Sequence, residues 1–285
     1  AYEIVSRDWS SDVCSSDLWG GVSTSGTGVI NGSMTMGAGA GTLSGELNGT
    51  GTLGLSGGTL TVAPSGFKVP GYAQYGGTLN GDGDLTAKSG FYWSSGTMTG
   101  AGKTVVGTGV TAGVIHTVDY GYNQPVLDRT LVNNGTLSHE AGYFNANLTI
   151  ATGGVLDNRG VYRFMGETGI DGSGSIVNSG TFSKIAGGGS SNIYVNVTNT
   201  GLLKVDSGTL WLPHFPVNSG TVEIAAGTAL STNGNALFND TTGVIAGSGT
   251  LALGGNVLTN AGTLRPGGVG ATGTLTIAGN LVQAP

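Results

Sequence analysis

The sequence predicts an all-β chain wound as a single-stranded, right-handed parallel β-helix (a β-solenoid) of about 12 coils with roughly 21 residues each. Three observations predict this fold. A phrase of Asn, any residue, Gly and a β-prone pair recurs, the glycines of successive copies are 19 to 25 residues apart, and short alternating strands lie between the copies. The phrase begins at Asn133, Asn158, Asn178, Asn199, Asn218 and Asn260, with a looser copy at Asn239.

Each phrase predicts a turn followed by a strand. Gly and Asn are the residues that most readily adopt left-handed backbone conformations. The residues after the turn alternate between apolar and polar, as in Thr221–Ile224, which is typical of a strand. A second glycine phrase, such as Gly208–Leu210, lies between copies, so each period holds two or three strands. We favour stacked coils over self-paired hairpins, because one coil alone cannot bury its apolar side chains.

The repeated asparagines form a candidate structural ladder. We expect the side-chain amides at the same turn of successive coils to hydrogen-bond to one another, and the alternative is that each amide serves only its own turn. The looser copy at Asn239 suggests that the register slips there. The predicted ladder residues are Asn133, Asn158, Asn178, Asn199, Asn218 and Asn260.

Composition limits the function classes. Glycine contributes 57 of 285 residues, and charged residues only 9%, against about 25% in an ordinary domain. The net charge is −6 and no Lys/Arg cluster occurs, so nucleic acid is not an expected partner. No apolar run has the eighteen or so residues of a membrane helix. We expect no metal and no cofactor.

The chain divides into three parts. Residues 8–18 resemble the translated read-through of a sequencing-library adapter, which implies that residues 1–18 are an artefact that includes the only cysteine, Cys14. Residues 19–130 predict an irregular Gly/Thr-rich solenoid, and residues 131–285 its regular continuation.

Four aromatic-rich segments are expected to be inserts outside the coils: 64–75, 91–93, 116–125 and 211–216. Prolines within them cannot donate to a strand ladder, and binding residues concentrate in loops. Exposed aromatics suit stacking against sugars, although aromatics at 91–93 are also compatible with a core. The candidate ligand-binding residues are Tyr72, Tyr75, Trp93, Tyr120, Tyr122 and Trp211.

A catalytic alternative depends on the densest charged segment. Polysaccharide lyases and hydrolases need clustered carboxylates and basic residues, and Arg159, Arg163, Glu167 and Asp171 are the candidates. The other interpretation is that these charges only solubilise the rod. We expect no catalytic residues and no enzyme activity.

A family resemblance is carried by the last coils. The phrase Gly262-Thr263-Leu264-Arg265-Pro266-Gly267, followed by Gly273–Gln283, resembles phrases in bacterial autotransporter passengers and filamentous-haemagglutinin-like adhesins. The resemblance implies a non-catalytic stalk or adhesin at the bacterial cell surface, tethered to the outer membrane through a further C-terminal region. It implies host or bacterial glycans or proteins as partners. The alternative is a carbohydrate-active β-helix enzyme.

Overall fold

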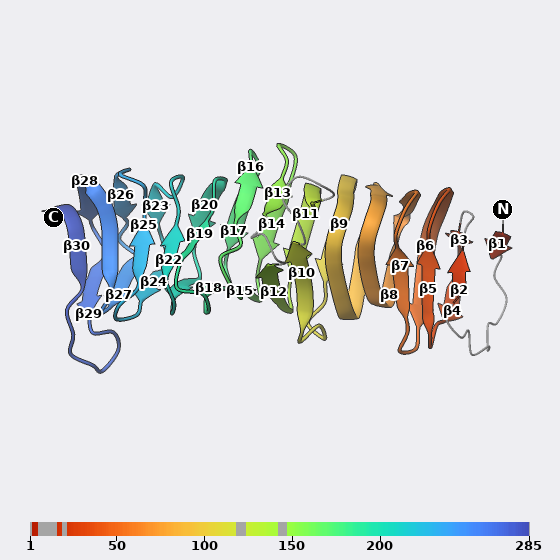
Figure 1. Cartoon of the computed structure of the whole chain (residues 1–285), viewed down its shortest axis with the longest axis horizontal. Coiled ribbons are helices and arrows are strands. Elements are labelled where there is room, and N and C mark those ends of the chain that lie inside the picture. The colour runs from red at the N-terminus through yellow and green to blue at the C-terminus, as the bar shows by residue number, and fades with distance from the viewer. Residues whose placement is uncertain (1, 5–15, 19–21, 118–123, 142–146, 285) are drawn as a thin grey trace.

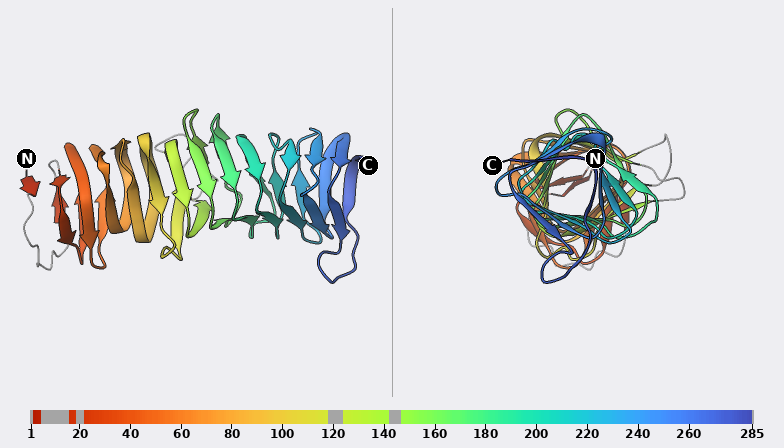
Figure 2. Two further views of the ribbon diagram at one scale, coloured as in Figure 1. Left: turned by 180° about the vertical axis from the view of Figure 1, so that it is seen from behind. Right: turned by 90° about the vertical axis from the view of Figure 1, so that its left-hand side faces the viewer.

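The chain is a parallel β-solenoid of about twelve turns, as the sequence predicts, and its described residues form no helix. The computed structural model describes residues 2–4, 16–18, 22–117, 124–141 and 147–284. The coils stack into a rod with β1 near one end and β30 at the other (Figure 1). Seen along the rod, they superimpose on one closed outline (Figure 2).

Three faces make up each coil, and within each face strands pair in parallel with the next coil. Face A carries the repeated asparagines and contains β4 (Thr27–Val29), β14 (Val155–Asn158), β17 (Ser175–Asn178), β20 (Asn196–Asn199), β23 (Val217–Asn218) and β26 (Leu237–Asn239). Face B follows the Asn-x-Gly turn and contains β2 (Ser16–Leu18), β5 (Ser33–Met36), β7 (Thr52–Leu55), β10 (Gly113–Thr117), β12 (Thr136–Ala141), β15 (Val161–Phe164), β18 (Thr181–Lys184), β21 (Leu202–Val205), β24 (Thr221–Ile224), β27 (Val244–Gly247) and β29 (Thr263–Pro266).

Face C closes the coil. It contains β1 (Tyr2–Ile4), β3 (Val22–Thr24), β13 (Leu148–Ile150), β16 (Ile170–Gly172), β19 (Ser190–Asn192), β22 (Thr209–Trp211) and β25 (Ala229–Ser231). The remaining strands turn corners and join the faces into one continuous sheet: β6 (Ala40–Asn48), β8 (Thr59–Gly81), β9 (Leu85–Val106), β11 (Val126–Asn133), β28 (Thr250–Asn260) and β30 (Thr276–Gln283).

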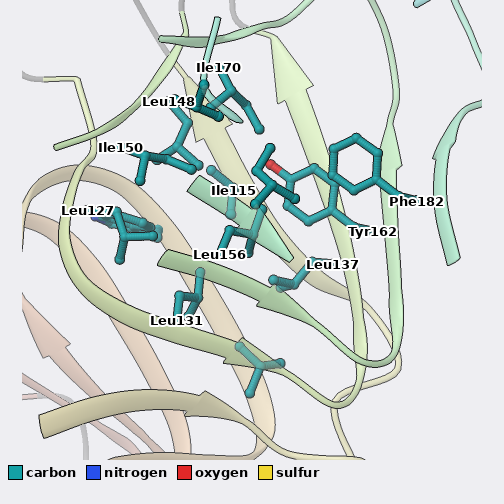
Figure 3. Close-up of a cluster of buried hydrophobic side chains, with 14 of the residues drawn as sticks. Ile115, Leu127, Leu131, Leu137, Leu148, Ile150, Leu156, Tyr162, Ile170 and Phe182 are labelled. Carbon is teal, nitrogen blue, oxygen red and sulfur yellow. The ribbon is translucent and has the colours of Figure 1, made fainter. Parts of the chain in front are cut away.

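The core is a column of apolar side chains running along the inside of the rod. On face B, the residues in register from coil to coil are Leu137, Tyr162, Phe182, Leu203, Val222, Ile245 and Leu264. All are fully buried except Leu264, which is partly buried against the core. The Tyr162 and Phe182 rings stack at 5.0 Å. Figure 3 shows side chains from all three faces meeting in this interior.

The asparagines of face A form a continuous amide ladder. The Nδ2 atom of Asn133 donates to Oδ1 of Asn158 at 2.8 Å, and each following asparagine repeats this bond with the next coil. Asn239 is a full member, because it accepts from Asn218 and donates to Asn260. The expected register slip there is wrong, since the longer turn after Asn239 absorbs the extra residues. The ladder ends on Oε1 of Gln283.

The glycine of the Asn-x-Gly turn is needed for close approach between coils. Its expected left-handed backbone is wrong, because none of these glycines is among the residues with positive φ. A Cβ on Gly180 would instead collide with the carbonyl oxygen of Gly160 in the preceding coil, and a Cβ on Gly201 with that of Gly180. Glycine therefore sets the tight spacing of the coils at this corner.

Two expected inserts, 64–75 and 91–93, are strands of the solenoid. Residues 64–75 lie within β8, and residues 91–93 lie within β9, where they pair with β8 and β10. Both prolines of the first segment fall near changes of face, so they remain compatible with strands on either side.

Candidate functional site

Two pairs of partly exposed aromatic side chains lie on the outside of the rod. The ring centroids of Tyr75 and Tyr92 are 5.3 Å apart, and Tyr75 is 51% exposed. The rings of Tyr194 and Trp211 are 5.0 Å apart and nearly perpendicular, and Tyr194 is 42% exposed. Each pair joins side chains from successive coils, so the regular stacking brings the rings together.

Two predicted ligand-binding residues, Tyr72 and Trp93, are core residues. They are 1% and 0% exposed, respectively. The Tyr72 hydroxyl donates to Oε1 of Gln74, and Trp93 Nε1 donates to the carbonyl oxygen of Ser95. Burial also raises the pKa of Tyr72 far above its usual value. Their prediction as sugar-stacking residues is wrong, because strand alternation directs their rings inward.

The other four predicted aromatics have different outcomes. Tyr75 and Trp211 are on the outside, in the two pairs described above. Tyr120 and Tyr122 lie outside the described residues.

Sequence reasoning missed Tyr92 and Tyr194 as members of the pairs. The sequence held a signal for Tyr194, because the apolar residues Ile193, Val195 and Val197 alternate with Tyr194 and Asn196, and this alternation places Tyr194 on the outer side of a strand. For Tyr92, alternation within Phe91–Trp93 required that one ring face opposite to the other two.

A carboxylate and an amide lie next to the Tyr194–Trp211 pair on face C. Ile170 pairs with Ile193, so the following outward residues, Asp171 and Tyr194, are neighbours on adjacent coils. Asp171 Oδ2 accepts a 2.7 Å hydrogen bond from Nδ2 of Asn147, one coil earlier. The Asp171 carboxylate therefore binds an amide of the preceding coil, and its backbone is in register with Tyr194 of the following coil.

The four charged residues of the catalytic alternative do not form one group. Arg163 lies in β15 on face B, whereas Asp171 lies in β16 on face C. Arg159 pairs with Asp157 at 2.6 Å, and Glu167 Oε1 accepts from the backbone N–H of Gly189. Among the described residues, no hydrogen bond or ion pair joins two members of the set. The structure therefore gives these residues no shared acid–base arrangement.

Among the described residues, three basic side chains are buried inside the coils: Arg129, His139 and Lys184. Burial lowers the pKa of His139 to about 3, with a smaller contribution from His116, and the Tyr162 hydroxyl lies 2.9 Å from His139 Nδ1. Burial also lowers the pKa of Lys184, whose Nζ donates to the carbonyl oxygens of Gly166 and Ala186. Arg129 donates to the carbonyl oxygens of Gly83 and Thr99. The Lys184 and Arg129 contacts stabilise corners of the solenoid.

The part of the chain that the structure describes holds no group of three or more His, Cys, Asp or Glu side chains placed to bind a metal. The same part contains no helix long and apolar enough to cross a membrane.

Comparisons of the chain with protein-family models, with curated proteins and with solved structures found no match. The fold and the surface geometry thus define the class: a parallel β-solenoid that displays paired aromatic side chains on its outer faces.

Proposed function

We propose that this chain is a segment of an exported bacterial surface protein, a β-helical stalk or adhesin passenger that binds glycans without catalysis. The observation that carries the proposal is the presence of two partly exposed ring pairs on the outside of the rod. Exposed apolar surface of this kind is typical of interaction sites.

The aromatic pairs are suited to sugar rings. A sugar presents C–H groups on its faces and hydroxyl groups at its edges, so an aromatic face covers the first while polar neighbours bind the second. Coil stacking fixes the positions of both rings before binding, and this reduces the entropy that a ligand must overcome.

Location and partners follow from the same proposal. The resemblance of residues 262–283 to adhesin phrases supports export to the bacterial surface, with a tether to the outer membrane. The proposed partners are host or bacterial surface glycans, or glycoproteins that carry them. The low density of basic residues supports partners other than nucleic acid.

A glycan array probed with the 285-residue chain tests the proposal. We expect binding that weakens when Tyr75 and Tyr92, or Tyr194 and Trp211, are replaced by alanine. Tyr72→Phe is the matched control, because it removes only a buried hydroxyl and should leave binding unchanged. Absence of binding by the folded chain, or full binding by both double variants, would reject the proposal.

A further inference from the structure

Two polar side chains, Asn147 and Asp171, lie on the same face of the rod as Tyr194 and Trp211. Face C places Asn147, Asp171, Tyr194 and Trp211 on four successive coils. At about 4.8 Å per coil, these side chains follow the rod axis for roughly 14 Å. This length suits a ligand of a few sugar rings lying along the axis.

The aromatic end of this track offers a ring face next to a ring edge. Tyr194 and Trp211 meet edge to face at an interplanar angle of 69°, and both side chains are at least partly exposed. Trp211 lies beside Asn192 in the preceding coil, whose Oδ1 accepts from the Ser190 hydroxyl. The ring pair is therefore bordered by polar side chains that can bind sugar hydroxyls.

The other end of the track is a strong hydrogen-bond acceptor. Asp171 accepts one hydrogen bond from Asn147 and retains acceptor capacity on its other oxygen. Within the described residues Asp171 belongs to no ion pair, and no Lys or Arg neutralises it. An uncompensated carboxylate attracts hydroxyl donors and repels anionic sugars.

We propose that Tyr194, Trp211, Asp171 and Asn147 form a subsite for a neutral oligosaccharide that lies along the solenoid axis. The sugar faces pack on the aromatic pair, and the sugar hydroxyls donate to the Asp171 carboxylate. This inference rests on the proposed function, since it names the ligand class of one of its two aromatic pairs.

Binding of cellohexaose, chitohexaose and hexagalacturonate to the 285-residue chain, measured by calorimetry, tests the subsite. We expect at least one neutral hexamer to bind and hexagalacturonate to bind at least about tenfold more weakly. Tyr194→Ala with Trp211→Ala should raise the Kd of that hexamer by about tenfold or more. Asp171→Asn should weaken neutral binding by about threefold to tenfold and reduce the discrimination against hexagalacturonate.

Phe238→Ala is the matched control, because it removes an exposed ring of face A that belongs to neither aromatic pair. Tyr75→Ala with Tyr92→Ala shows which of the two pairs binds the hexamer. Circular dichroism of each variant verifies that the solenoid remains folded. Neutral binding that depends on Tyr75 and Tyr92 alone, or a preference for hexagalacturonate, overturns the subsite while glycan adhesion survives. If no glycan binds to the folded chain in either assay, the subsite and the proposed function both fall.

Discussion

The side chains of Asn178 and Asn199, on successive coils, are joined by a 2.7 Å hydrogen bond from Nδ2 to Oδ1 inside the rod. Both residues are 1% exposed, so water cannot replace this bond. Asn178 also accepts from Asn158 and donates to the carbonyl oxygen of Leu202. A single buried amide thus connects three coils.

Replacement of Asn178 by alanine should destabilise the chain. It leaves the Oδ1 of Asn199 and the carbonyl oxygen of Leu202 without this donor, and we expect a loss of about 2–4 kcal/mol in the free energy of unfolding. Urea unfolding, monitored by circular dichroism, measures this change in the free energy of unfolding. The control is Asn196→Ala on the neighbouring strand β20, where the side chain is exposed. Equal stability of the two variants would contradict a structural role for the ladder.

Gly180→Ala should be poorly tolerated although its backbone is compatible with any residue. Its new methyl group would overlap the carbonyl oxygen of Gly160, so the two coils must separate, at a cost of about 1–3 kcal/mol. Gly188→Ala is the control, because nothing lies within 4 Å of a Cβ there. Melting temperatures of the two variants are compared. If Gly180→Ala and Gly188→Ala lower the melting temperature equally, close approach between coils is not the reason for glycine at position 180.

Phe182→Ala should remove a central part of the core. The ring stacks on Tyr162 at 5.0 Å and meets Phe164 edge-on at 5.3 Å, so its loss should cost about 3–5 kcal/mol. Phe238→Ala removes a ring that is 40% exposed and should cost less than about 1 kcal/mol. Chemical denaturation measures the free energy of unfolding of both variants. A decrease for Phe182→Ala as small as that for Phe238→Ala would argue against a single continuous core.

Acid should destabilise the chain through His139. Its pKa is about 3 in the folded state, against 6.5 for a free side chain, so the unfolded state binds a proton that the folded state excludes. Above pH 6.5 the proton uptake of the unfolded state does not reduce the stability. As the pH falls from 6.5 toward 3, the free energy of unfolding decreases by up to about 1.4 kcal/mol per pH unit. Urea unfolding between pH 4 and 7 measures the slope.

His139→Leu should flatten this pH dependence, because leucine has no proton to gain. His214→Leu serves as the control, because it makes the same substitution at an exposed position. An unchanged slope in the His139 variant would show that other groups cause the acid sensitivity.

The fold could be predicted because its signal repeats. The spacing of the Asn-x-Gly phrases indicates coil length, and alternation such as that in Thr221–Ile224 indicates strands. The direction of individual side chains was harder to predict. In Phe91–Trp93, alternation requires adjacent rings to face opposite sides, but only pairing with Tyr72–Gln74 of the preceding coil decides which rings turn inward.

The role of the turn glycine and the candidate site depend on contacts between coils that only the folded chain shows. A glycine in the sequence is compatible with either a positive φ or a lack of room for a Cβ atom. The close approach of Gly180 to the carbonyl oxygen of Gly160, without a positive φ, shows that lack of room is the reason here. Likewise, Tyr194 and Trp211 are 17 residues apart in sequence and meet only because successive coils stack. Asp171 joins them through register, which no local pattern encodes.

The amide ladder gives the rod a direction. From Asn133 to Gln283 each donor points toward the next coil and each acceptor toward the previous one, so the amide dipoles align and add, as peptide dipoles do in a helix. The amide N–H groups of the ladder face the C-terminal end of the rod and the amide oxygens face the N-terminal end. The two ends of the rod are therefore electrically unlike.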